Sequence, residues 1–177
     1  MKKDKCNERV RRIGSVPQGC PCGFYSDPQH ECTCTIPQIQ RYRSRVSGPL
    51  LDRIDIHIEV PAVRYRDLTQ WQEGESSNHI RERVKEARGV QQGRFQGKKI
   101  FCNAQMTSRY LKRYCQIDEE GSRLLETAMA KFGLSARGYT RILKVARTIA
   151  DLEGAEAIAP HHLSEAIQYR TLDRGIL

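Results

Sequence analysis

The sequence lacks any apolar run close to the roughly 18 residues that a membrane-spanning helix requires. Its first residues, Met-Lys-Lys-Asp-Lys-Cys-Asn-Glu, are too polar for the hydrophobic region of a secretory signal. These two absences predict a cytoplasmic protein without a membrane partner. Because cytoplasmic thiols are kept reduced, the seven cysteines are not expected to form a disulfide framework.

Several motifs of nucleotide-binding and hydrolytic enzymes are missing as well. Gly-x-x-x-x-Gly-Lys followed by Ser or Thr does not occur, so the chain encodes no phosphate-cradling loop. It has no apolar run ending in paired acids that would hold Mg²⁺, no His-Glu-x-x-His and no Ser/His/Asp arrangement. We therefore expect the chain alone to carry no complete catalytic site.

Positive charge is abundant and is spread over the whole chain. Thirty Lys and Arg residues against twenty-one Asp and Glu give a net charge of +9. Such a charge permits attraction to nucleic acid or nucleotide without establishing either. At 177 residues the chain has room for one ordinary domain or two small ones.

The second half of the sequence predicts a helical bundle, and the first half does not. Capping residues and apolar spacing predict helices that begin near Pro37, Ser76, Thr107, Asp118, Ser135 and Pro160. The helix after Ser76 is expected to carry one apolar face, formed by Ile80, Val84, Ala87 and Val90. Residues 54–60 alternate apolar and polar side chains and predict a single strand, whose sheet must be completed elsewhere.

Four of the cysteines form a cluster, Cys20-Pro-Cys22 and, after nine residues, Cys32-Thr-Cys34. Four thiolates so close in sequence satisfy the ligand set of a closed, tetrahedral Zn²⁺ site. The alternative is a set of reduced thiols without metal, and His30 is a less favoured substitute ligand. Three other cysteines are expected to be ordinary thiols: Cys6, Cys102 and Cys115.

Arg53 stands between Asp52 and Asp55 at the entrance of the predicted strand. We expect these two acids to flank its guanidinium. An arginine fixed in this way suits a phosphate outside its own subunit, because guanidinium is always charged and presents a rigid fork of donors. A structural Arg–Asp pair at a loop end is the alternative, and this segment alone does not decide between them.

Two further arginines lie at the start of the helix after Ser135. Arg137 is in its first turn and Arg141 lies one turn further along. Cations are mildly disfavoured at a helix amino terminus, so Arg137 suggests an anionic partner; a salt bridge to a neighbouring helix is the alternative. Lys144 and Arg147 are interpreted as a solvated face. His57 is interpreted as part of the polar face of its strand. His161 and His162 are interpreted as residues of a first helical turn that are not metal ligands.

Several segments together closely resemble one family, the magnesium-chelatase-related AAA+ ATPases (the YifB/ComM group), in its carboxy-terminal part. The resemblance covers about residues 20–174. The segments that carry it are Cys20-Pro-Cys-Gly-Phe-Tyr, Cys32-Thr-Cys, Gln40-Arg-Tyr and residues 47–57, 134–152 and 162–174.

The resemblance implies a mainly α fold in two parts. Residues 19–73 would be the tail of the AAA+ α/β core, with one or two strands, a helix and the cysteine-rich loop. Residues 74–177 would form the α-helical lid. Before them, residues 1–18 are basic and nearly free of apolar periodicity, which by itself predicts a poorly ordered segment.

The resemblance also implies roles for the three arginines. Arg53 would be the arginine finger that reaches the γ-phosphate of ATP–Mg²⁺ in the neighbouring subunit. Arg137 would be the sensor-2 arginine of the lid, with Arg141 as second choice. Full-length members of the family form homo-oligomeric rings, and the competence-linked members act on DNA as branch-migration motors.

Two departures from the family pattern qualify these roles. Gln18 stands where the family has the sensor-1 asparagine, and no Walker A or Walker B region precedes it. The chain would therefore be a truncated product, an expressed fragment or a diverged piece, and would be inactive alone. A second hypothesis is a zinc-stabilised basic module that binds nucleic acid or caps a partner ATPase ring.

Overall fold

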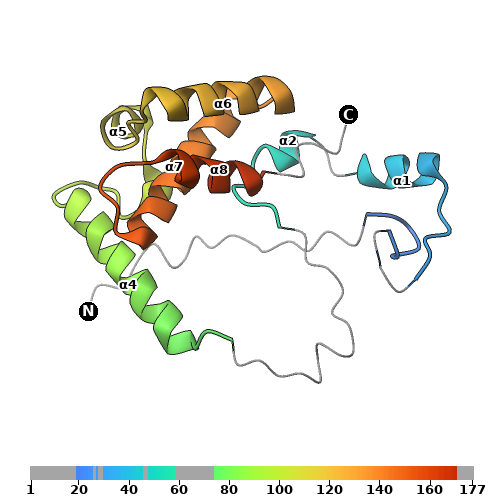
Figure 1. The fold of residues 1–177 in the computed structure, drawn as a ribbon, viewed down its shortest axis with the longest axis horizontal. Coiled ribbons are helices and arrows are strands. Elements are labelled where there is room, and N and C mark those ends of the chain that lie inside the picture. Colours follow the sequence, from blue (N-terminus) through green and yellow to red (C-terminus); the bar gives the residue numbers. More distant parts are fainter. Residues whose placement is uncertain (1–18, 26, 28–29, 46–47, 59–73, 171–177) are drawn as a thin grey trace.

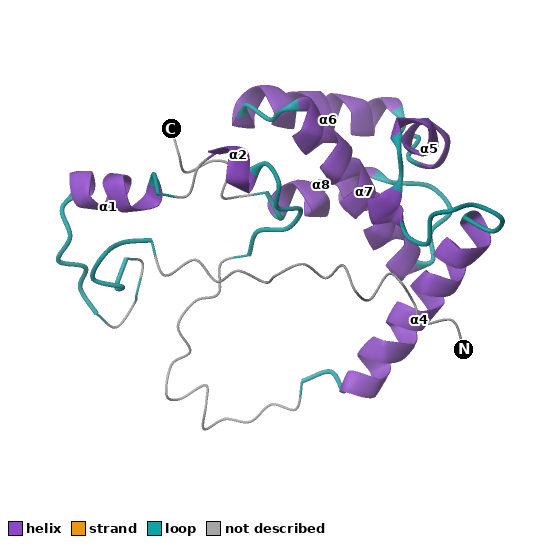
Figure 2. Ribbon diagram, turned by 180° about the vertical axis from the view of Figure 1, so that it is seen from behind, coloured by secondary structure: helices purple, strands orange, loops and turns teal. Residues whose placement is uncertain are grey.

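The computed structural model describes residues 19–25, 27, 30–45, 48–58 and 74–170. Within these residues the protein is mainly helical, as predicted, and contains no strand (Figures 1 and 2). The elements are α1 (Ile36–Arg43), α2 (Gly48–Leu51), α4 (Ser77–Arg94), the 3₁₀ helix η2 (Asn103–Gln105), α5 (Ser108–Tyr114), α6 (Glu119–Phe132), α7 (Ala136–Glu153) and α8 (Pro160–Gln168). Gln18, Cys6 and the connector 62–73 lie outside the described residues.

The helix boundaries follow the capping residues that the sequence predicted. The side chains of Ser76, Asp118 and Ser135 each accept a backbone N–H of the first turn of α4, α6 and α7. Gly133 and Gly154 end α6 and α7 with φ of 59° and 77°, where a side chain would be strained. Local sequence therefore sets where these helices start and stop.

Helix α7 is the centre of the bundle and packs against α8, α4, α5 and η2, while α6 packs against α8. In Figure 1, α7 and α8 lie between α6 and α4. The α6–α8 contact is so close that a Cβ on Gly121 would meet Leu163 at 2.7 Å. None of the described helices has the length and hydropathy needed to cross a membrane. The largest fully buried apolar side chains are Leu125, Ile142 and Leu163.

A buried ionic network joins α4 to α7. The Arg94 guanidinium donates to both carboxylate oxygens of Asp151, over 2.7 and 2.5 Å, and Arg147 Nε donates to the same carboxylate over 3.0 Å. Asn103 Nδ2 adds a fourth hydrogen bond of 2.7 Å. Burial opposes ionisation of Asp151, but the hydrogen bonds from Arg94 and Asn103 hold its pKa below its usual range.

This network shows that the interpretation of Arg147 and Lys144 as a solvated face was wrong. Arg147 is only 2% exposed, because its guanidinium reaches across to Asp151 and to two backbone carbonyls after α7. Lys144 is half-buried and donates to the carbonyl of Ala104 over 2.9 Å. A basic residue on a central helix is buried when the neighbouring elements supply acceptors.

The strand predicted over residues 54–60 is not confirmed. Residues 54–58 are irregular, and residues 59–60 lie outside the described part. A strand needs a neighbouring strand, and the described residues supply none. His57, interpreted as a polar-face residue, is instead buried, and its backbone N–H donates to the carbonyl of Tyr169 over 2.7 Å. The isoleucines of the segment are exposed: Ile54, Ile56 and Ile58.

Candidate metal centre and arginine-bearing loop

The four clustered cysteines come together in space as the sequence predicted. Their sulfur atoms all lie within 4.8 Å of one another. The separations are 3.3 Å for Cys20–Cys22, 3.6 Å for Cys22–Cys32 and 3.7 Å for Cys20–Cys32. Four sulfurs bound to one Zn²⁺ at about 2.3 Å would lie roughly 3.8 Å apart at the corners of a tetrahedron. The thiol cluster therefore has the donor set and the spacing of a tetrahedral metal site.

The thiols of the cluster differ in their pKa values. The backbone N–H of Phe24 and then the Cys20 thiol lower the pKa of Cys22 to about 6. The pKa of Cys32 is raised to about 12; the backbone of Cys34 opposes this rise, whereas burial and the neighbouring sulfurs cause it. One thiolate thus forms readily, and its negative charge repels a second thiolate beside it. A divalent cation would remove that repulsion.

The loop that carries the cluster is fixed to α1. Cys34 lies directly before Thr35, which is the N-cap of this helix. The backbone N–H of Thr35 donates to the side chain of Gln38. At the other end of α1, the Arg43 guanidinium lies 4.7 Å from the centre of the Tyr25 ring in the loop. A metal held by the cysteines would therefore also set the position of α1.

The other candidate ligands remain apart from the thiol cluster. His30 Nδ1 lies 3.3 Å from a carboxylate oxygen of Asp27, and its ring stacks on Phe24. Cys102 and Cys115 are buried elsewhere, and burial raises the pKa of Cys115 to about 11. Among the described residues, no histidine and no fifth cysteine is placed to replace a member of the cluster.

Arg53 lies in the turn that follows α2. Its N–H bonds to the carbonyl of Leu50 over 3.0 Å, and the buried side chain of Leu51 anchors the turn. The Arg53 side chain is exposed and forms no ion pair within the part of the chain that the structure describes. The loop thus holds an arginine at the surface on a fixed backbone.

The two aspartates beside Arg53 do not flank its guanidinium, so that prediction was wrong. Asp52 accepts a hydrogen bond of 2.7 Å from the Ser135 hydroxyl and lies 3.8 Å from Arg137. Asp55 is bound by Arg141. These acids face the start of α7 because its exposed N–H groups and arginines attract negative charge. Arg170 also contacts this loop, donating to the Ile54 carbonyl over 2.7 Å.

The structure therefore brings the three predicted arginines into one neighbourhood. Arg137 and Arg141 pair with the acids on either side of Arg53, in the turn that follows α2 and not on a neighbouring helix. The Arg137 side chain is 55% exposed and its pairing distance is long, whereas the Arg141 side chain is 22% exposed. Burial, followed by the charge of Arg170, lowers the pKa of Arg141.

A second cluster, which the sequence analysis did not identify, joins the end of α7 to α8. Glu153 is bound by His162 and lies 3.0 Å from Nε2 of His161. The buried His162 accepts the Ala159 N–H at Nδ1 over 2.9 Å, so its own proton lies on Nε2 and points to Glu153. This arrangement caps α8 and leaves no lone pair of His162 for a metal. A histidine three residues after the N-cap was the available signal.

Known proteins resemble the chain over most of its length. The family model for the magnesium chelatase subunit ChlI matches residues 13–68, and the model for the carboxy-terminal part of ChlI matches residues 74–170. The competence protein ComM of Haemophilus influenzae is 43% identical over 156 residues, which are 87% of this chain and 29% of ComM.

Two uncharacterized proteins show the same coverage. YifB of Salmonella typhimurium is 41% identical over 158 residues, 89% of this chain and 30% of YifB. Rv2897c of Mycobacterium tuberculosis is 32% identical over 151 residues, 85% of this chain and 29% of that protein. The chain thus spans about 30% of the length of these relatives. It belongs to the magnesium chelatase ChlI-type family and corresponds to its carboxy-terminal part.

Proposed function

We propose that the chain supplies the arginine finger and the lid of an ATP-hydrolysing AAA+ ring. The observation that carries this proposal is the position of Arg53. Two aspartates stand beside it in sequence, yet both pair with arginines of α7. Arg53 is left exposed and without an ion pair among the described residues. Its charge is therefore available to an anion outside the chain.

The chemistry of phosphoryl transfer suits such an arginine. Negative charge on the γ-phosphate shifts during transfer, and a guanidinium that donates to its oxygens stabilises the transition state. The chain encodes no phosphate-cradling loop of its own. ATP and Mg²⁺ would be held by the part of the family that precedes the segment matched here, in a neighbouring subunit. Domain boundaries at residues 18 and 73 remain a prediction.

Arg137 and Arg141 would act as lid arginines on the nucleotide. A phosphate can replace a carboxylate as the partner of a guanidinium because both present paired oxygens. Arg137 is the better candidate, since its contact with Asp52 is exposed and long and is therefore weak. The Arg141 side chain is less exposed and pairs more closely with its acid, Asp55.

The proposal is tested by a chimera in which residues 20–170 replace the matching part of the Haemophilus protein. ATP hydrolysis by this chimera should depend on Arg53. Hydrolysis that is indifferent to Arg53 would contradict the proposed role.

The thiol cluster would hold one structural Zn²⁺. We expect about one zinc ion per chain in protein purified without added metal, because the four sulfurs match the tetrahedral spacing. Cys22→Ser and Cys32→Ser should each lower the zinc content sharply, whereas Cys115→Ala, outside the cluster, should leave it unchanged. Zinc is measured by atomic emission. A content near zero in the unaltered protein would exclude the metal site.

A basic surface around α5 favours the second hypothesis, a nucleic-acid-binding module. The helix contains no acidic residue and carries three exposed cations. The preceding loop carries a fourth, next in sequence to Lys98, which donates to Tyr114 and lies over the Tyr110 ring of α5. The residues of this basic surface are Lys99, Arg109, Lys112 and Arg113. Such a surface would neutralise phosphates and release counterions.

If the basic surface binds DNA, Lys112→Ala with Arg113→Ala should weaken binding and reduce its salt dependence. The slope of log affinity against log salt should fall by about 2, since each lost phosphate contact removes about 0.9. Fluorescence anisotropy with duplex DNA at several salt concentrations measures this. Arg123→Ala with Lys131→Ala, two exposed cations of α6, is the matched control. Binding that does not change with salt would contradict the module.

A further inference from the structure

Helix α4 has an apolar stripe that the bundle covers over only half of its length. Ile80, Val84, Ala87 and Gln91 follow one line along the helix at 100° per residue. Ala87 and Gln91 are buried, but Ile80 and Val84 are 41% and 44% exposed. Figures 1 and 2 show the first turns of α4 extending beyond α7. The predicted apolar face is thus only partly used within the chain.

Positive charge borders this exposed half, which we call the α4 stripe (Ile80 and Val84). Arg81 lies on one side of the stripe, donates to the Asn78 side chain over 3.1 Å and forms no ion pair with a described residue. Arg83 lies on the other side and is paired with Glu75 over 3.1 Å. Glu82 and Glu86 fall on the opposite side of the helix. The α4 stripe therefore suits an apolar surface that also carries negative charge.

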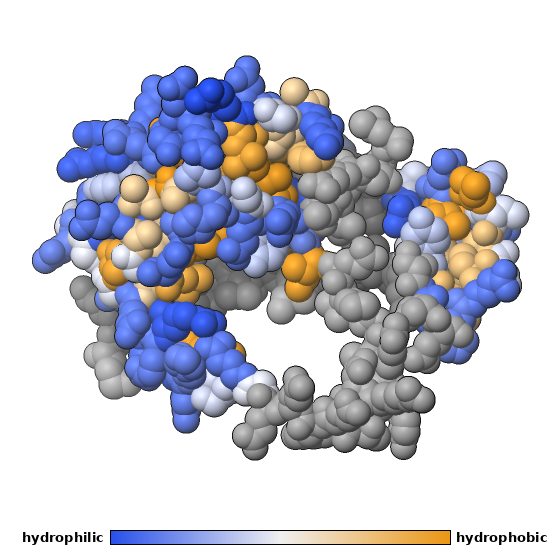
Figure 3. All heavy atoms as spheres, in the orientation of Figure 1, coloured by the Kyte–Doolittle hydropathy of each residue, from blue (hydrophilic) through white to orange (hydrophobic). Residues whose placement is uncertain are grey.

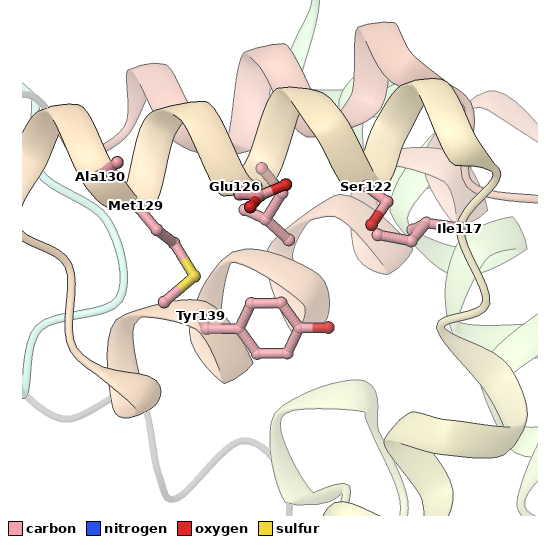
Figure 4. Close-up of a pocket in the computed structure, with 7 residues that line it drawn as sticks. Ile117, Ser122, Glu126, Met129, Ala130 and Tyr139 are labelled. Atoms are coloured by element: carbon pink, nitrogen blue, oxygen red, sulfur yellow. The ribbon is translucent and has the colours of Figure 1, made fainter.

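Such a surface lies on the far side of the bundle, in a groove between α6 and α7 of about 420 Å³. Figure 4 shows Met129, Glu126 and Ser122 projecting from α6 toward the ring of Tyr139 on α7. Figure 3 shows an apolar area next to α6 surrounded by hydrophilic surface. Glu126 forms no ion pair with any described residue. The α6–α7 groove is lined by Ile117, Leu125, Glu126, Met129, Ala130 and Tyr139.

We propose that the α4 stripe of one copy of the chain docks in the α6–α7 groove of a second copy. This inference rests on the ring proposed above and identifies a contact that would build it. An amphipathic helix binds a groove through apolar anchors one turn apart, as Ile80 and Val84 are. Arg81, which has no acidic partner among the described residues, would meet Glu126.

Charge also argues against the two symmetric alternatives. Stripe against stripe would bring the Arg81 guanidinium groups of two copies together, and groove against groove would bring two Glu126 carboxylates together. Two different surfaces in contact form a head-to-tail interface, which repeats from copy to copy and generates rings when the rotation closes.

The test uses one variant on each surface of the full chain. Val84→Asp places an acid in the stripe, and Ala130→Lys places a base in the groove; both positions border solvent. Sedimentation velocity should show that the unaltered chain associates beyond a dimer. Each variant alone should associate at least about tenfold more weakly. An equal mixture should regain association, because the intact stripe of the Ala130→Lys variant fits the intact groove of the Val84→Asp variant, and the acid and base introduced at the other contact attract each other.

Gly89→Asp and Thr127→Lys serve as matched controls. Gly89 lies opposite the stripe, and a Cβ there meets nothing within 4 Å. Thr127 is exposed on α6 outside the groove lining. Both controls should associate like the unaltered chain. Unchanged helical content by circular dichroism excludes misfolding of the two surface variants.

The proposal is overturned if the unaltered chain stays monomeric up to its solubility limit. It is also overturned if either surface variant associates as strongly as the unaltered chain, or if their mixture associates no better than each variant alone. These measurements involve no nucleotide. Loss of association would therefore leave the role of Arg53 intact, and an unimportant Arg53 would leave the docking contact intact.

Discussion

Replacing Arg53 by alanine should reduce ATP hydrolysis by the assembled chimeric ring about 10³- to 10⁵-fold. The arginine is exposed, and the acids beside it pair with α7, so its removal breaks no ion pair within the described part of the chain. The loss should therefore fall on catalysis and not on folding. Phosphate release at saturating ATP measures the rate, and sedimentation confirms that the ring still forms.

Two further variants define what is lost. Arg53→Lys should recover little activity, because an ammonium does not present the planar fork of a guanidinium. Arg41→Ala removes another exposed arginine, on α1, and should leave the rate unchanged. If the Arg53→Ala ring hydrolyses ATP at a rate within a few-fold of the rate of the unaltered ring, Arg53 takes no part in catalysis.

Asp151→Ala should destabilise the protein by about 3–5 kcal/mol. The substitution leaves Arg94 and Arg147 buried without the carboxylate that binds both. Urea denaturation followed by circular dichroism measures the free energy of unfolding. Glu86→Ala, an exposed change on α4, should alter it by no more than about 0.5 kcal/mol.

The stability difference caused by Asp151→Ala should also depend on pH in a defined direction. The pKa of Asp151 is lowered in the folded protein, so its stabilising contribution is present above the ordinary aspartate pKa of about 3.9. It is lost as the pH falls through the lower, folded-state value. The stability difference from Asp151→Ala should shrink in that acidic range. A difference below about 1 kcal/mol at neutral pH would contradict the network's role.

The helices of the bundle were predictable because their signals are local. A serine or aspartate cap and a closing glycine act within one turn, so Ser135 and Gly154 mark α7 in the sequence as they do in the structure. The surroundings of Arg147 were not predictable. Its burial depends on Asp151 and on carbonyls beyond the end of α7, and helical periodicity alone places it on a polar face.

The two candidate sites also differ in how far the sequence could predict them. The cysteines are close in sequence, and a short loop with a turn at Gly23 is enough to bring their sulfurs together. The partners of Asp52 and Asp55 lie more than 80 positions away, at the start of α7. Proximity in sequence suggested that these acids would hold Arg53. In the folded protein these acids pair instead with arginines of α7.

Action of Arg53 on a neighbouring subunit can be measured directly by mixing two inactive chimeras. One carries Arg53→Ala, and the other has lost the phosphate-binding lysine that the family carries upstream. In a mixed ring, an intact ATP site next to an intact Arg53 occurs at about a quarter of the interfaces if subunits assemble at random. We predict that mixing restores ATP hydrolysis to about that fraction. A mixture as inactive as its two components would contradict the account.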